Sequence, residues 1–214
     1  MTSPEQARIA QAAGASRLYA SADALNQGVW PDDMLARVVP WLDEVCREAD
    51  HSRLDPCIRT GAPVAVGNIS ELACALDCHA MAEIRECIPL HNDYAVSALV
   101  NSGACGVWLN SELTLAEIAH IAENASVPVG YLVSGRIRTM TSEHCVLMAT
   151  GKCIHDCDTC KLRQEPHYLR GIDNDYLPVT TDTQGRSRIW APQPFDAVPE
   201  LDVLLAHGVT RLMV

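Results

Sequence analysis

The sequence predicts an α/β protein: a partial (β/α) barrel of the TIM type, followed by a cysteine-rich segment and a small α+β tail. Over the first 134 residues, short apolar runs alternate with Ala- and Leu-rich stretches of helical length, which is typical of parallel βα units. The alternation then stops, and four cysteines follow between residues 145 and 160. We therefore expect two domains, 1–140 for the partial barrel and 141–214 for the cysteine segment, hairpin and terminal helix and strand.

Five short runs are expected to form the parallel strands, because each is rich in Val, Ile, Leu or Ala and precedes a polar or acidic residue. They comprise residues 17–20, 63–67, 82–90, 106–110 and 128–134. A closed barrel of this type needs eight strands and about 250 residues. Five strands therefore predict an open sheet, and its unpaired edge favours a homo- or hetero-oligomer that completes the barrel.

Helices are expected between these strands, at about 32–49, 70–79, 93–102 and 114–124. Three of them begin with residues typical of helix caps: Ser70, Asn92, and Thr114 with Glu117 three residues later, which forms a capping box. After the cysteines, the sequence predicts a hairpin of residues 175–182 and 187–190, a helix at 196–207 and a strand at 209–214.

Composition and charge exclude several classes of protein. Hydrophobic residues make up 48% of the 214 residues and charged residues 20%, which is typical of a globular chain and not of a disordered one or a coiled coil. The net charge of −11 argues against broad binding of duplex DNA. Eight of the 16 Lys and Arg residues lie in 136–188, so the charge distribution is compatible with a local pocket for a small anion or one flipped base.

Two further features concern location. The longest uncharged run, residues 94–111, is interrupted by Ser, Asn and Gly, and it predicts no membrane span. The first residues show no basic segment followed by an apolar stretch, so we expect no signal peptide and a cytoplasmic protein.

Four of the ten cysteines form the strongest motif, Cys145-x7-Cys153-x3-Cys157-x2-Cys160. Thiolates are soft ligands, and four on a short segment can hold a tetrahedral Zn²⁺ or a [4Fe–4S] cluster. Zinc sites favour two matched Cys-x2-Cys pairs, and the single pair here favours [4Fe–4S]. Redox thiols or buried hydrophobic thiols are the remaining alternative. The other six cysteines, including Cys78, are expected to be small buried hydrophobes.

Several stretches resemble the U32 peptidase family, the collagenase-like proteases: Ile88-Pro-Leu-His-Asn92, Gly106 to Leu113, and Gly135 to Cys145. The resemblance covers about residues 60–214. It implies a [4Fe–4S] cluster held by four cysteines and an oxygen-independent hydroxylation of a small aromatic ring or an RNA base. It also implies the alternative of a peptidase, that is, a hydrolase.

Residue by residue, Cys145, Cys153 and either Cys157 or Cys160 match the clustered ligands of that family. Several relatives take a further ligand from the hairpin region, where this chain has Gly185-Arg-Ser187 and no cysteine. The family's first barrel strands have no counterpart either, which implies a shortened member or strands supplied by a partner. A third hypothesis is therefore a non-catalytic metal-binding accessory subunit.

The remaining candidates are substrate-binding residues at the expected carboxyl ends of strands and beside the first cysteine. They are His91, Asn92, Arg136, Arg138, Glu143 and His144. The two arginines could bind a carboxylate or phosphate, or could form ion pairs with Glu143 or another acid. Alternatively, His91 and Asn92 serve only to cap a helix. Glu143 and His144 could transfer protons or orient Cys145. The chain has no motif of serine hydrolases, zinc peptidases or nucleotide-binding loops, so the sequence identifies no catalytic residue.

Overall fold

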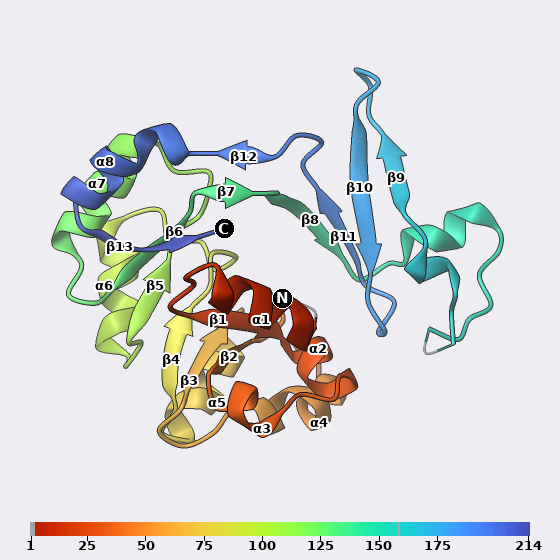
Figure 1. The fold of residues 1–214 in the computed structure, drawn as a ribbon, viewed down its shortest axis with the longest axis horizontal. Helices are drawn as coiled ribbons and strands as arrows, with labels where there is room; N and C mark the ends of the chain where they lie inside the picture. Colours follow the sequence, from red (N-terminus) through yellow and green to blue (C-terminus); the bar gives the residue numbers. More distant parts are fainter. Residues whose placement is uncertain (1–2, 158) are drawn as a thin grey trace. The chain divides into compact units, whose positions relative to one another are not determined.

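The computed structural model describes residues 3–157 and 159–214 (Figure 1). The chain divides into two compact units: unit 1 is Met1–Leu132 with Pro199–Met213, and unit 2 is Val133–Val198. The sequence placed the last helix and strand with the cysteine segment. In the structure they belong to unit 1, because the last strand pairs with a strand of its sheet.

Unit 1 is built on a curled parallel sheet of seven strands, a half-barrel (Figure 1). In order across the sheet, the strands are β1 (Leu18–Ser21), β2 (Val38–Trp41), β3 (Pro63–Val66), β4 (Met81–Ile84), β5 (Gly106–Trp108), β6 (Val129–Leu132) and β13 (Val209–Met213). Each neighbouring pair is parallel. The predicted α/β class and the partial barrel are confirmed.

The count of five strands is wrong, because two strands of this sheet were not expected in it. The helix expected at 32–49 is replaced by α3 (Asp32–Leu35), which is a single turn, and by β2. The residues of β2 explain the difference: Val38 and Val39 favour a strand, and Pro40 cannot donate the hydrogen bond that a helix interior needs. The terminal strand joins the sheet as β13, beside β6.

The helices of unit 1 are α1 (Pro4–Ala12), α2 (Ala22–Gln27), α3, α4 (His51–Leu54), α5 (Ile69–Asp77), α6 (Asp93–Asn101), α7 (Leu115–Asn124) and α8 (Leu201–Ala206). The helices expected at 70–79, 93–102 and 114–124 are confirmed as α5, α6 and α7. Asn92 caps α6, and Thr114 forms the capping box of α7 as predicted. Asn68 caps α5 in place of Ser70, since its side chain accepts from the Glu71 amide at 2.9 Å.

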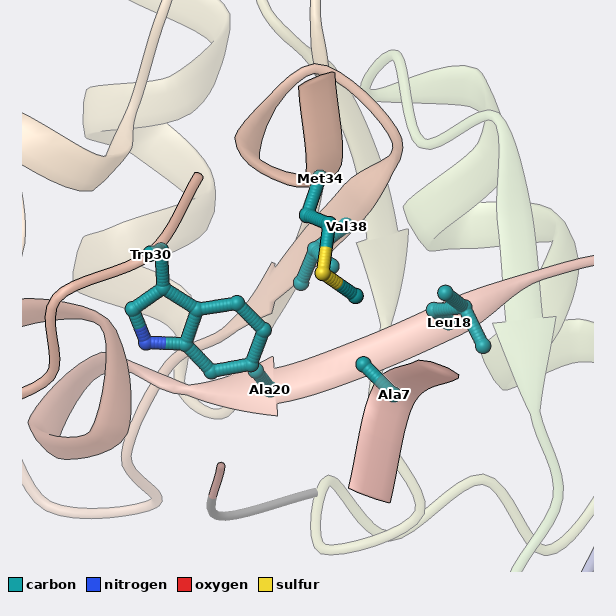
Figure 2. Close-up of a cluster of buried hydrophobic side chains, with 6 residues drawn as sticks. All are labelled: Ala7, Leu18, Ala20, Trp30, Met34 and Val38. Carbon is teal, nitrogen blue, oxygen red and sulfur yellow. The ribbon is translucent and has the colours of Figure 1, made fainter. Parts of the chain in front are cut away.

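The outer face of β1 carries part of the hydrophobic core (Figure 2). Leu18 and Ala20 alternate along the strand, so both point to the same face. They pack with Ala7 of α1 and with Trp30 and Met34 from the segment that leads to β2. All five are buried, and the Trp30 indole N–H donates to the Ala24 carbonyl at 2.7 Å.

The inner face of the sheet carries aromatic rings. Tyr19, Trp41 and Trp108 meet edge to face, with ring centroids 5.1–6.2 Å apart. The absence of a side chain at Gly130 leaves space for Trp108, since a Cβ at residue 130 would lie 2.3 Å from the indole ring. The small residue on β6 therefore allows the large one on β5.

Glu83, on the central strand β4, is the acidic centre of this inner face and is fully buried. Its carboxylate pairs with Arg17, which precedes β1, and with Arg211 of β13 at 3.1 Å. It also accepts from the Tyr19 hydroxyl at 2.7 Å and from the Trp108 indole at 3.4 Å. One carboxylate thus links the central strand to both edge strands of the sheet.

Unit 2 contains an antiparallel sheet in the order β8-β11-β10-β9. Its strands are β8 (Arg138–Ser142), β11 (Ser187–Trp190), β10 (Tyr176–Thr181) and β9 (His167–Arg170), and β7 (Ser134–Gly135) pairs separately with β12 (Phe195–Asp196). The hairpin expected at 175–190 is present as β10 and β11. In the part of the chain that the structure describes, no helix is long and apolar enough to cross a membrane.

We predict that Glu83→Gln lowers the free energy of unfolding of unit 1 by about 3 kcal/mol, because two arginines then face a neutral amide in a buried site. Urea unfolding followed by tryptophan fluorescence measures this change. Glu112→Gln, at an exposed position, is the control and should change stability by less than about 0.5 kcal/mol. Equal midpoints for the two variants would contradict the role given to Glu83.

Candidate functional site

The four clustered cysteines lie in unit 2, on the segment between β8 and β9. Cys145 immediately precedes the 3-10 helix η3 (Val146–Thr150), and Cys153, Cys157 and Cys160 precede η4 (Leu162–Gln164). All four are free, half-buried, and line a single pocket of about 180 Å³. The segment therefore brings its four thiols to the wall of one cavity.

The hairpin forms another part of this wall. Thr181 and Asp182, at the end of β10, line the pocket. Gly185 turns the hairpin with φ +77°, and a Cβ there would lie 3.1 Å from the Cys157 sulfur. Ser187 accepts a hydrogen bond from the Val146 amide at 3.0 Å. The hairpin thus packs against the cysteine segment through backbone and hydroxyl groups.

The thiols also act on one another electrostatically. Burial raises the pKa of Cys157, and negative charge on Cys145, Cys153 and Cys160 raises it further. Arg163, which lines the same pocket, opposes this effect. The Cys157 thiol therefore ionises reluctantly until a positive charge lies beside it.

The donor set and the size of the pocket fit a metal group held by thiolates. Four soft sulfur donors suit Zn²⁺ or an iron–sulfur cluster. A cavity of roughly 150 Å³ is known to hold a benzene molecule, so this pocket has room for more than a single ion. The described residues contain no group of three or more His, Cys, Asp or Glu side chains whose positions would hold a metal ion.

The predicted substrate residues fall in both units. His91 and Asn92 lie in unit 1, where both are exposed and the Asn92 side chain accepts from the Ala95 amide at 2.8 Å. Arg136 lies in unit 2 and donates to the carbonyls of Ala191 and Pro192 at 2.8 and 2.7 Å. Asn92 and Arg136 therefore both have structural partners within their own units.

Three more predicted residues lie near the start of the cysteine segment. Arg138 begins β8, opposite Trp190 of β11. Glu143 is exposed and lies 3.6 Å from the Arg186 guanidinium, with which it forms an ion pair. His144 is also exposed, and its amide donates to the Ser142 hydroxyl at 3.1 Å.

A second polar group, which the sequence did not single out, lies at the carboxyl ends of β2, β3 and β4. Gly67, after β3, approaches the loop after β2 so closely that a Cβ would lie 2.3 Å from the Asp43 carbonyl oxygen. Cys87, after β4, donates to the Gly67 carbonyl at 3.2 Å. Arg53 pairs with Asp43 at 2.6 Å, which holds the loop after β2 in place.

Glu71 is the unusual acid of this region. It is buried, and one carboxylate oxygen accepts from the Gly67 amide at 2.9 Å. The other oxygen has no hydrogen-bond partner among the described residues. Burial raises the pKa of Glu71 to about 7, although the Gly67 amide and Arg85 oppose the rise. This carboxyl therefore exchanges its proton near neutral pH.

The expectation that the six scattered cysteines are buried holds for Cys57 only. Cys78 is exposed at the end of α5, and Cys46, Cys74, Cys87 and Cys105 are half-buried. Burial in the hydrophobic core therefore does not account for the five cysteines other than Cys57.

The model of peptidase family U32 matches residues 62–214, which is most of the chain. The chain belongs to peptidase family U32. The match takes in β3 to β13 and all of unit 2, so the four clustered cysteines of this U32 protein lie inside it, whereas β1, β2 and the loop after β2 lie outside. No curated protein and no solved structure matches this U32 chain.

We predict that Glu71→Gln makes this U32 protein more stable at high pH. The folded chain keeps the Glu71 proton to about pH 7, whereas the unfolded chain loses it near the ordinary value of 4.5. Between these values the folded state binds more protons, so stability falls as pH rises. The shift corresponds to about 3 kcal/mol.

Urea unfolding at pH 5 and pH 8 measures this effect. The variant, whose amide oxygen can still accept from Gly67, should match the parent protein near pH 5 and exceed it at pH 8. The same difference between variant and parent at both pH values would show that Glu71 is ionised in the folded chain.

Proposed function

We propose that this U32 protein holds a [4Fe–4S] cluster on Cys145, Cys153, Cys157 and Cys160 and hydroxylates an aromatic ring or an RNA base without oxygen gas. The observation that supports this proposal is the shared pocket of about 180 Å³, which all four thiols line. When bound, such a cluster supplies one-electron redox chemistry, at a potential tuned by the hydrogen bonds and solvent exposure of its sulfurs.

The residues around the pocket suit this role. The backbone N–H of His155 donates to the Cys153 sulfur at 3.4 Å, which orients the sulfur. Arg163 supplies positive charge from the wall, and Lys152 and Lys161 are next to Cys153 and Cys160 in sequence. Leu147, Met148, Ile154 and Leu162 make much of the remaining wall apolar, which limits water at the sulfurs.

The proposed substrate contacts are the residues beside the first clustered cysteine. In unit 2 they are Arg138, Glu143 and His144, of which the last two are exposed near Cys145. His91 and Asn92 are separate candidates in unit 1, where both are exposed. The net charge of −11 favours a small ring or a single base over a duplex. Ten free thiols suit a reducing compartment, so we propose a cytoplasmic location.

Three alternatives compete with this function. Zn²⁺ on the same four thiolates would make the site structural. A peptidase is the activity that the family's description gives. A non-catalytic accessory subunit would keep the metal for stability only. Metal analysis distinguishes structural zinc from the cluster. Assays of catalytic turnover distinguish the peptidase from the non-catalytic accessory subunit.

We predict that protein prepared without oxygen is brown, with broad absorption near ~400 nm from sulfur-to-iron charge transfer. Cys157→Ala should remove most of this absorption and should destabilise residues 140–165, because metal binding there is also folding energy. Iron, sulfide and zinc analysis, together with hydrogen exchange of unit 2, measures both effects.

Cys78→Ala is the matched control, since Cys78 is an exposed thiol in unit 1. It should keep full iron content. A colourless parent protein with one zinc per chain would replace the cluster by structural zinc. A variant Cys157→Ala with unchanged iron would remove Cys157 from the ligand set.

The edges of the half-barrel lead to a further prediction about assembly. In the described residues, β1 and β13 each pair with one neighbour, and open sheet edges invite a partner strand. We expect the purified protein to sediment as an oligomer at tens of micromolar. A monomer at that concentration would show that the edges need no partner.

A further inference from the structure

Three polar side chains lie in a row between β2 and β3, in unit 1: Cys46 is in the loop after β2, His51 begins α4, and Asp55 directly follows α4. The Cys46 sulfur lies 3.9 Å from Nε2 of His51. The other ring nitrogen of His51, Nδ1, lies 3.0 Å from a carboxylate oxygen of Asp55. Thiol, imidazole and carboxylate thus stand in a row, at the carboxyl end of the parallel sheet, where (β/α) barrels place their reactive groups.

The order of these groups matches a nucleophile, its base and the group that orients the base. An Nδ1–H that donates to Asp55 leaves the Nε2 lone pair directed to the thiol. His51 can then take the Cys46 proton, and Asp55 stabilises the imidazolium that forms. A neighbouring imidazolium favours the thiolate, which is the reactive form of cysteine.

Folding alone does not explain this arrangement. The side chains of His51 and Asp55 are 43% and 47% exposed, and exposed ion pairs contribute little to stability. Cys46 is half-buried, so part of its surface is open to a reagent. The row of groups therefore has a geometry that stability does not require.

The loop around the row is held firmly. Arg53, two residues after His51 in α4, pairs with Asp23 at 2.7 Å, Asp43 at 2.6 Å and Asp50 at 3.3 Å. The Arg47 amide, next to Cys46, donates to Asp50 at 2.9 Å. A site needs such support to keep its reactive groups within hydrogen-bond reach.

The charges around His51 favour its protonated form. The hydrogen bond to Asp55 raises the pKa of His51, and the charge of Asp55 adds to the rise. Asp50 of the 3-10 helix η1 (Glu48–Asp50) acts in the same direction, as does Glu71 of α5 where it is ionised, whereas partial burial opposes the rise.

We propose that Cys46 is the nucleophile of a second reactive site, which accepts an acyl group from an activated ester or thioester. The Cys46 proton moves to His51 Nε2 as the sulfur–carbonyl carbon bond forms. The bond from that carbon to the alkoxide or thiolate leaving group then breaks, and the leaving group takes the proton. Water, deprotonated by His51, releases the carboxylic acid and restores the thiol.

This site is independent of the four clustered cysteines. Cys46, His51 and Asp55 lie in unit 1 and outside residues 62–214, which the family model matches. Failure of the metal proposal would therefore leave this proposal unchanged, and the reverse also holds.

Alkylation by iodoacetamide tests the nucleophile on the full-length protein, with each cysteine followed separately by peptide mass spectrometry. The exposed Cys78 is the internal control. At pH 6, we expect Cys46 to react about tenfold faster than Cys78, because its thiolate is stabilised. Asp55→Asn should reduce this ratio, and His51→Ala should bring it close to one, while both variants keep the parent's melting temperature.

p-Nitrophenyl acetate tests the acyl step. We expect one equivalent of nitrophenolate to be released in a burst, with one acetyl group on the peptide that contains Cys46. Cys46→Ser should abolish both signals, whereas Cys78→Ser should keep them. Alkylation of Cys46 no faster than that of Cys78 at pH 6, or acetylation of Cys46 that persists unchanged in His51→Ala, would overturn the proposal.

Discussion

The half-barrel depends on one buried carboxylate at its centre. Glu83 lies on the fourth of seven strands and holds Arg17 and Arg211 from the two edges of the sheet. A flat sheet would keep those edges too far from the central strand, so these contacts require strong curvature. Burying the charge is tolerable only because cationic and hydrogen-bonding partners surround it. The curvature also draws the loops after β2, β3 and β4 together, as the contact of Gly67 with Asp43 shows.

Local signals explain which parts of the fold could be predicted. Asn92 and Thr114 predict the starts of α6 and α7, because a capping residue and the helix that it begins are adjacent in sequence. The hairpin around Gly185 is recognisable for the same reason. β2 was mistaken for helix because the residues before it, from Asp32, do form a helical turn. The contacts of Glu83 could not be predicted, since its partners are far away in sequence and meet it only after the sheet curls.

The distinction between local features of the sequence and contacts between distant residues also holds for the sites. The spacing of the four cysteines is local, so their grouping on one segment could be predicted, whereas Thr181 and Asp182 reach the same pocket only through the hairpin. Cys46, His51 and Asp55 are also close in sequence, yet they were not recognised. A His and an Asp four residues apart are common on helices, and nothing in the spacing shows that the thiol points back to the imidazole.

The chain thus keeps thiols in two opposite electrostatic environments. Burial raises the pKa of Cys157, and the charges of the other clustered thiols raise it further, so its thiolate is disfavoured unless a cation lies beside it. Cys46 stands beside an imidazole that a carboxylate helps to protonate, an environment that favours the thiolate without any metal. Both sulfurs are half-buried, and they differ in the groups that surround them. The environment of each sulfur, more than the number of cysteines, therefore determines the chemistry available to this protein.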